Sequence, residues 1–320
     1  MANVESGSPR VVVLGSLVFD IAIQVDHVPK THETVLASAV TVSAGGKGLC
    51  QAVAARRLHA QVHVIGRVGT DVFADVLLAV MDREGIDRTA VTRDEAGTHL
   101  SVPIVTPDGN NRIIGAPRSS MRVTPEDVDA GAEALSTCDL VLLQGETPLA
   151  ACLAALDKLA PDALVVWNPA PASFSLAEML GRERGARVSW LTPNETEATE
   201  LTGIAVTDRE SAVAAARYIQ RLYPHVGVVV TLGDRGALAL PADAEPIFTP
   251  TLDVRAVDPT AAGDVFSAAF GVALLRARSV DDAIAFANVA GALTTTRVGA
   301  VLSIPTLDEV LATADESRKS

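Results

Sequence analysis

The chain has 320 residues, 48 % of them hydrophobic, and a formal net charge of −13. That length is enough for a large core in one or two domains, whereas so acidic a chain without a basic stripe is unsuited to binding nucleic acid or anionic membranes. The three cysteines, Cys50, Cys138 and Cys152, have neither zinc-site nor disulfide spacing. The sequence also lacks a signal peptide and any apolar run of about 18 residues, so it predicts a cytoplasmic protein without a membrane span.

The first part of the chain contains two kinds of predicted strand. Residues 10–15 are continuously apolar, as in a strand buried on both faces, whereas residues 20–28 and 34–42 alternate and predict half-exposed strands. Residues 98–114 predict two more half-exposed strands joined by a turn that contains Asp-Gly. Between these segments the pattern predicts a helix that starts at the glycines of 45–48, a strand at 61–66 and a helix at 71–85.

From residue 139 onward, predicted strands and helices alternate. Strands are expected at 139–144, 163–168, 187–192 and 226–232, and helices at 148–160, 194–202, 209–222, 261–277 and 280–296. Apolar strands that alternate with helices predict an α/β fold with a doubly wound, mostly parallel sheet. The segments at about 20–42 and 98–116 do not fit that layer and predict a small separate sheet within a single domain spanning 1–320. Residues 181–188 predict a charged loop.

The stretch "VDPTAAGDVFSAAF", residues 257–270, crowds small side chains around one carboxylate, Asp264, where a helix begins. The first amides of a helix have no partner within the helix and carry partial positive charge. Small residues let an anion approach these amides, so the turn suits a phosphate. A carboxylate placed there can take a proton from a hydroxyl. A tight Gly/Ala turn with an ordinary first-turn acid is the alternative interpretation.

Other polar residues follow predicted strands, where ligands bind in open α/β sheets. Asp20 follows the first strand, Glu146 another, and the turn "TLGDRG" (231–236) a third. Asn194 and Glu197 fit either a helix cap or a pair acting through metal-bound water. The first turn has a single glycine and "AGGKGLC" lacks the P-loop spacing, so neither predicts a dinucleotide or P-loop site.

Taken in order, these segments resemble the ribokinase family of carbohydrate kinases, of the phosphofructokinase-B type. "AGGKGLCQAVAARRL" (44–58) is similar to the first signature of that family and "DPTAAGDVFSAAF" (258–270) to the second. "GSLVFD", "QGETP", "NPAP", "TPNETEA", "TLGDRGA" and "RVGAVLSIP" match in order as well. The resemblance covers nearly the whole chain and implies an ATP-dependent kinase that phosphorylates a primary hydroxyl of a small sugar.

The resemblance also implies roles for individual residues. Asp264 would be the general base, and the amides of Ala261, Ala262 and Gly263 would form an anion hole. The sugar site would include Asp20, Gly45, Gly46, Lys47 and Glu146, and ATP would lie along Asn194, Thr231, Gly233, Asp234, Gly236 and Asn288. Glu197 would hold Mg²⁺ through water, and Asp258, Thr260, Thr294, Arg297, Gly299 and Ser303 would surround a monovalent cation such as K⁺. The small sheet would be a lid, through which two copies could form a homodimer.

Three positions depart from the pattern of that family. Val18 and Cys50 stand where it usually has asparagines, and Arg118 stands where it usually has a small residue near the lid. Loss of two amides predicts a site that favours a deoxy sugar over ribose. Three alternatives stay open: a nucleoside kinase, although 98–120 contains no aromatic residue; an acidic-sugar kinase with Arg118 on a carboxylate; and a ligand sensor without turnover.

Overall fold

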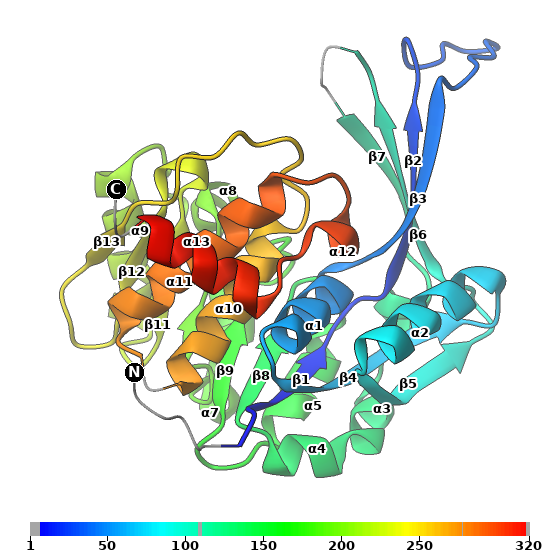
Figure 1. Cartoon of the computed structure of the whole chain (residues 1–320). Helices are drawn as coiled ribbons and strands as arrows, with labels where there is room; N and C mark the ends of the chain where they lie inside the picture. Colours follow the sequence, from blue (N-terminus) through cyan, green and yellow to red (C-terminus); the bar gives the residue numbers. More distant parts are fainter. Residues whose placement is uncertain (1–6, 108–110, 277, 318–320) are drawn as a thin grey trace.

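The computed structural model describes residues 7–107, 111–276 and 278–317. Its main sheet has nine strands in the order β13-β12-β11-β10-β9-β8-β1-β4-β5 (Figure 1). Neighbours from β11 to β5 are parallel, and β12 is antiparallel to both β11 and β13. The strands are β1 (Arg10–Leu14), β4 (Gln61–Gly69), β5 (Asp87–Asp94), β8 (Leu140–Leu143), β9 (Leu164–Trp167), β10 (Trp190–Leu191), β11 (Gly227–Thr231), β12 (Ala237–Leu240) and β13 (Ile247–Thr249).

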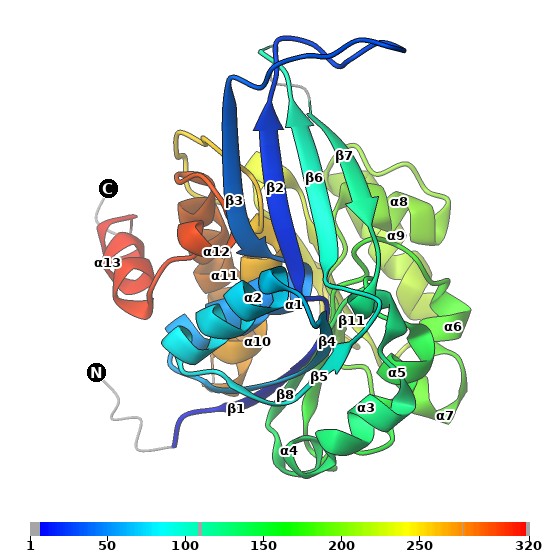
Figure 2. The same cartoon turned by 90° about the vertical axis from the view of Figure 1, so that its right-hand side faces the viewer.

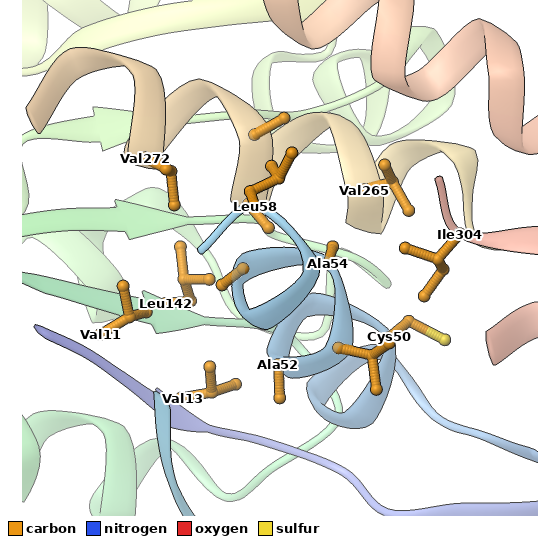
Figure 3. Close-up of a cluster of buried hydrophobic side chains, with 14 of the residues drawn as sticks. Val11, Val13, Cys50, Ala52, Ala54, Leu58, Leu142, Val265, Val272 and Ile304 are labelled. Carbon is orange, nitrogen blue, oxygen red and sulfur yellow. The ribbon is translucent and has the colours of Figure 1, made fainter. Parts of the chain in front are cut away.

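Helices cover both faces of this sheet, because its central strands are apolar on both sides. In β1, Val11 and Val13 pack with α1, α2, α10 and α11 (Figure 3), while Val12 and Leu14 pack on the other face with α3, α4, α5, α6, α8 and α9. The helices are α1 (Lys47–Arg57), α2 (Val72–Glu84), α3 (Pro125–Ala130), α4 (Ala132–Thr137), α5 (Leu149–Leu156), α6 (Leu176–Leu180), α7 (Arg182–Gly185), α8 (Glu195–Thr202), α9 (Arg209–Leu222), α10 (Ala262–Leu275), α11 (Val280–Thr295), α12 (Ala300–Ser303) and α13 (Leu307–Ser317). Among the described residues, no helix is long and apolar enough to cross a membrane.

A second sheet stands away from the body of the molecule (Figures 1 and 2). Its strands, in the order β3-β2-β6-β7, are β3 (Ala39–Gly45), β2 (Val18–Gln24), β6 (His99–Val105) and β7 (Asn111–Ala116). Side chains alternate along each strand, so paired residues share a face. Val18, Asp20 and their partners His99 and Ser101 therefore lie on one face, and Phe19, Ile21, Val40 and Val42 on the other.

Most predicted elements are confirmed, and three are corrected. The strand expected at 187–192 shrinks to Trp190–Leu191, because the amides of Arg187 and Val188 still bond within the turn that follows α7. The strand expected at 34–42 is Ala39–Gly45, since the Ser38 amide closes the hairpin on the Gln24 carbonyl and pairing then continues to Gly45. The loop expected at 181–188 contains the short helix α7. The expected Asp-Gly turn at 108–109 lies outside the described residues.

Candidate active site

The site is built where α1 and α10 begin, beside the carboxyl ends of β1 and β8. Lys47 is the first residue of α1, and Asp264 lies in the first turn of α10. The two helices pack together through residues as small as Ala54 (Figure 3). Small side chains at this contact let the two helix starts approach each other closely. The two motifs that the sequence analysis singled out are thereby brought together.

Asp264 is a buried carboxylate, 8 % exposed. Its Oδ1 accepts a hydrogen bond of 3.2 Å from the Gln51 side chain. Burial raises the pKa of Asp264 to about 6, and the nearby Lys47 ammonium opposes that rise while Glu146 adds to it. In return, attraction to Asp264 is the largest of the effects that raise the pKa of Lys47. The carboxylate is thus ionised at neutral pH but holds its charge with difficulty, which suits a proton acceptor.

The turn before Asp264 leaves room for an anion. Ala261, the residue that caps α10, has a positive φ of 65°, and no side chain caps the helix there. No atom lies within 4 Å of the position that a Cβ on Gly263 would occupy. The amide of Ala262 donates to the Pro259 carbonyl at 3.2 Å, so this amide must be shared or released if it is to hold an anion. The space itself is available without moving any side chain.

A cluster of polar side chains lies beside Lys47, at the base of the small sheet. The Glu146 carboxylate accepts hydrogen bonds from the Ser16 hydroxyl and, at 3.3 Å, from the Lys47 amide. Burial raises the pKa of Asp20 to about 6, and a hydrogen bond from Ser101 opposes the rise. A Cβ on Gly45 would lie 2.0 Å from Asp20 Oδ2, so only glycine leaves that carboxylate its place. The predicted sugar-site residues therefore come together, including Gly46, whose φ of 91° suits glycine.

Val18 lies on the same face of the small sheet as Asp20, and Cys50 lies close enough to Asp20 and Lys47 for their charges to act on its thiol. Val18 is 6 % exposed, and its Cγ2 would lie 2.9 Å from a Cβ on Gly46. Cys50 is 2 % exposed, beside Val265 and Ile304 (Figure 3). Burial raises the pKa of the Cys50 thiol, and Asp264 and Asp20 raise it further. The thiol stays protonated and acts as a small apolar side chain at the edge of the site.

A cleft of about 830 Å³ lies on the other side of Asp264. All six residues predicted to lie along a nucleotide line it, and so do Ala262 and Gly263: Asn194, Thr231, Gly233, Asp234, Gly236 and Asn288. Asn288 also fixes one wall, because its side-chain amide donates to the carbonyls of Thr249 and Pro250. The cleft thus leads from the β11–η2 turn (η2, Gly233–Arg235) to the start of α10.

Glu197 serves as the predicted cap and also faces the site. Its carboxylate accepts from the Asn194 amide at 2.9 Å, and the Asn194 side chain accepts from the Glu197 amide at 2.9 Å. The side chain is 9 % exposed, and burial raises its pKa, while attraction to Lys47 and repulsion from Asp264 also act on it. A single buried carboxylate near two other charges fits an ion that keeps most of its water.

The predicted cation-site residues surround the turn before α10. Asp258 joins two segments, since its carboxylate accepts from the Thr260 amide and from the Gly299 amide, each at 2.9 Å. Thr294 and Ser303 donate their hydroxyl protons to carbonyls of their own helices, and their oxygens keep lone pairs. The Arg297 side chain pairs with Glu309, which leaves only its main chain for a cation.

Several residues of the site escaped the sequence analysis. Ser16, Gln51, Ser101 and Gln144 bond to its carboxylates or to one another, and all but Ser101 stand within one or two residues of a predicted site residue. His99 shares the face of Asp20, and its buried Nδ1 has no hydrogen-bond partner. The alternation of side chains along β2 and β6 is the signal that could have found Ser101 and His99.

Arg118 lies beside Gly97 and near Asp71. Its Nη1 would lie 2.9 Å from a Cβ on Gly97, and the Asp71 carboxylate lies beside the same position. The guanidinium thus packs over the turn that leads into β6. Among the described residues, Asp71 is thus an acidic neighbour of Arg118 within the protein, and the acidic-sugar alternative stays a prediction.

Comparison with known proteins agrees with this arrangement. Residues 8–307 match the model of the family described as pfkB family carbohydrate kinase. The chain is 36 % identical over 301 residues to a ribokinase of Haemophilus influenzae and 33 % identical over 301 residues to a deoxyribokinase of Salmonella typhi; each match covers 93 % of this chain and 96 % of the relative. A solved structure of Arabidopsis thaliana ribokinase complexed with ribose and ATP superposes with a TM-score of 0.87 at 29 % identity, over 96 % of this chain and 99 % of that one.

Proposed function

The chain belongs to the pfkB family of carbohydrate kinases, and on that premise we propose that it transfers the γ-phosphoryl group of ATP to a primary hydroxyl of a small sugar. The observation that carries this proposal is the place of Asp264. The cleft that would hold the nucleotide ends at Ala262 and Gly263, and the polar cluster that contains Asp20 and Glu146 lies beside Lys47. A base at that junction reaches both substrates.

Asp264 would take the proton of the sugar hydroxyl as the hydroxyl oxygen forms a bond to the γ-phosphorus. The bond from that phosphorus to the bridging oxygen of ADP breaks in the same displacement. Lys47 and the amides at the start of α10 would offset the charge of the phosphoryl oxygens. Glu197 would hold Mg²⁺ through water, and the ion would neutralise phosphate charge when bound.

We further propose that the sugar is a deoxy sugar by preference. Val18 and Cys50 are buried apolar side chains next to the polar cluster that contains Asp20 and Lys47. A hydroxyl that faces Val18 would lose its water without a full replacement, at a cost of about 1–3 kcal/mol. A methylene group in the same place has no such cost. Both a ribokinase and a deoxyribokinase are among the similar proteins, so the fold accommodates either preference.

A monovalent cation would act through the turn before α10. Asp258 ties residues 258–260 to the 299 segment, and the carbonyls around it surround the start of the helix. A cation held there would fix the amides before the phosphate arrives, which is preorganisation and not direct chemistry.

The exposed face of the small sheet is the surface through which we propose that two copies pair. Val40, Val42 and Ile114 are 60 %, 59 % and 59 % exposed, and all three project from the face opposite Asp20. Half-buried Ile21 and Ile23 adjoin them on the same face. A contiguous apolar face of this kind is typical of an interaction surface.

Asp264→Asn should abolish most turnover, because the amide keeps the shape but cannot accept the proton. General-base loss costs about 10²–10⁴ in rate. Since burial raises the pKa of Asp264 to about 6, kcat/KM of the parent should fall as pH drops through about 6. Asp281→Asn, which changes an exposed first-turn acid of α11, is the matched control and should stay within about threefold of the parent. Turnover of the Asp264 variant within threefold of the parent would contradict the assignment.

Replacing potassium should slow the enzyme. At constant ionic strength, tetramethylammonium cannot replace potassium, because its methyl groups keep oxygen ligands away from the charge, so the start of α10 would lose its preorganisation. We expect a loss of about tenfold or more in kcat, which is smaller than the roughly 10²–10³-fold loss on removing an oxyanion-hole donor, because the amides themselves remain. Steady-state assays in potassium chloride and in tetramethylammonium chloride give the comparison, and equal rates would remove the cation from the proposal.

Val42→Lys should convert the dimer to a monomer, because it places a charge in the apolar face of the small sheet. Val76→Lys, on the exposed side of α2, changes the same residue type away from that face and should leave the dimer intact. Light scattering at micromolar concentration measures both. A parent that is already a monomer, with and without substrates, would refute the pairing.

Restoring two amides should shift the preference of the enzyme toward ribose. The double variant Val18→Asn with Cys50→Asn offers hydrogen bonds to a hydroxyl, so the kcat/KM ratio of ribose to 2-deoxyribose should rise by about tenfold or more. This ratio does not depend on the fraction of active enzyme, so partial unfolding of the variant does not obscure it. A parent that strongly prefers ribose, or a ratio that does not move, would show that these positions do not read the sugar.

A further inference from the structure

Two buried glutamines form a chain that ends on Asp264. Gln51 lies in α1, and Gln144 directly follows β8; both are fully buried. Gln144 Nε2 donates to Gln51 Oε1 at 2.7 Å, and Gln51 Nε2 donates to Asp264 Oδ1 at 3.2 Å. These hydrogen bonds connect three segments that lie far apart in the sequence.

These two hydrogen bonds fix which way the Gln51 amide faces. With its oxygen satisfied by Gln144, Gln51 must present its nitrogen to Asp264. If the amide were reversed, its oxygen would face a carboxylate and its nitrogen would face the nitrogen of Gln144, and both contacts would be repulsive. The Gln144 side chain occupies the space beside Gly15, where an added Cβ would lie 2.2 Å from its Oε1. Glycine at the end of β1 thus gives the Gln144 side chain its room.

This arrangement is costly, so it calls for an explanation. Gln144 Oε1 is buried without a hydrogen-bond partner. Buried polar groups are nearly always paired, and an unpaired one lowers stability. Apolar side chains of the same size would fill this space without that cost. The pair therefore serves something other than stability, and the group at its end is Asp264.

We propose that Gln51 is a positioning residue for the base, that it holds Oδ1 of Asp264 so that Oδ2 faces the sugar hydroxyl, and that Gln144 sets its orientation. This inference rests on the proposed role of Asp264. A neutral donor suits the task, because it favours the ionised carboxylate without adding a second positive charge beside Lys47. Gln51 contacts the carboxylate from α1 and needs no contact with substrate.

The test is the pH dependence of kcat/KM for the sugar at saturating MgATP. Gln51→Met removes the donor at nearly the same volume, so the pKa of Asp264 should rise and the acid limb should move up by about one pH unit. At pH 6.5 the variant should be about threefold or more below the parent, and it should approach the parent at pH 8.5. Gln51→Glu places a second acid beside Asp264 and should move the limb further.

Gln144→Met leaves the Gln51 amide free to turn and should move the limb in the same direction by less. Gln220→Met is the matched control: that side chain donates to the carbonyls of Val226, Leu240 and Pro241 in a part of α9 remote from the site. It should lower the melting temperature without moving the limb.

If the folded Gln51 and Gln144 variants lose activity equally at every pH, or if their acid limb coincides with that of the parent, the inference fails. Should Gln51→Met not fold, Gln51→Glu and Gln144→Met decide by the same criterion. Asp264→Asn separates this inference from the proposed function. An active Asp264→Asn enzyme removes the base itself, whereas an inactive one together with an unmoved limb removes only the role of Gln51.

Discussion

The site depends on keeping one carboxylate and one ammonium, Asp264 and Lys47, out of water at the starts of two helices. Each charge loses hydration that is worth several kcal/mol, and their mutual attraction offsets the loss only while both stay in place. Close approach of α1 and α10 keeps them there. A Cβ on Gly48 would lie 2.5 Å from the backbone of Gly15, and one on Gly271 would lie 2.7 Å from Leu140. These small residues therefore do more than expose amides to a phosphate: they let both helices pack closely on the sheet, so that the two charges lie near enough to interact.

The same contact divides the ligand space. Since Asp264 sits at the end of the cleft lined by Ala262 and Gly263, the groups on either side of it face different chemistry. The cleft is lined by glycine turns and adjoins the 249–250 segment, to which Asn288 donates hydrogen bonds. The polar cluster beside Lys47 contains carboxylates and lies at the base of the small sheet. The burial that raises the pKa values of Asp20 and Asp264 is thus a property of one shared interior, open on two sides to two kinds of substrate.

The fold and the motif residues could be predicted because their signals are local. Continuous apolar runs mark the strands of the main sheet, alternating runs mark those of the small sheet, and helical segments mark the layers that cover the main sheet. The residues at the ends of the strands follow from these assignments. The links between distant segments could not be predicted. Nothing near Gln51 indicates that it meets Gln144, 93 positions further along the chain. β5 was missed because its edge position leaves it polar, and β10 was overestimated because a turn takes up the residues before Trp190. The Ala262 amide, bonded to the Pro259 carbonyl, likewise follows from turn geometry that no motif encodes.

Buried polar groups near the proposed sugar site lower the stability of the protein by different amounts when no substrate is bound. An asparagine at position 18 or 50 would need a partner inside an apolar surrounding whenever the sugar is absent, and an unpaired amide there would cost about 1–3 kcal/mol. Val18 and Cys50 avoid that cost and pack against Gly46 and Val265 instead. Gln144 does the opposite, since it keeps an unpaired oxygen in the core. In the function proposed here, the chain lacks buried polar groups where a sugar hydroxyl would only be bound and keeps them where a proton is moved. A weaker contact to a bound hydroxyl changes which sugar is preferred, whereas a misplaced base slows the reaction with every sugar.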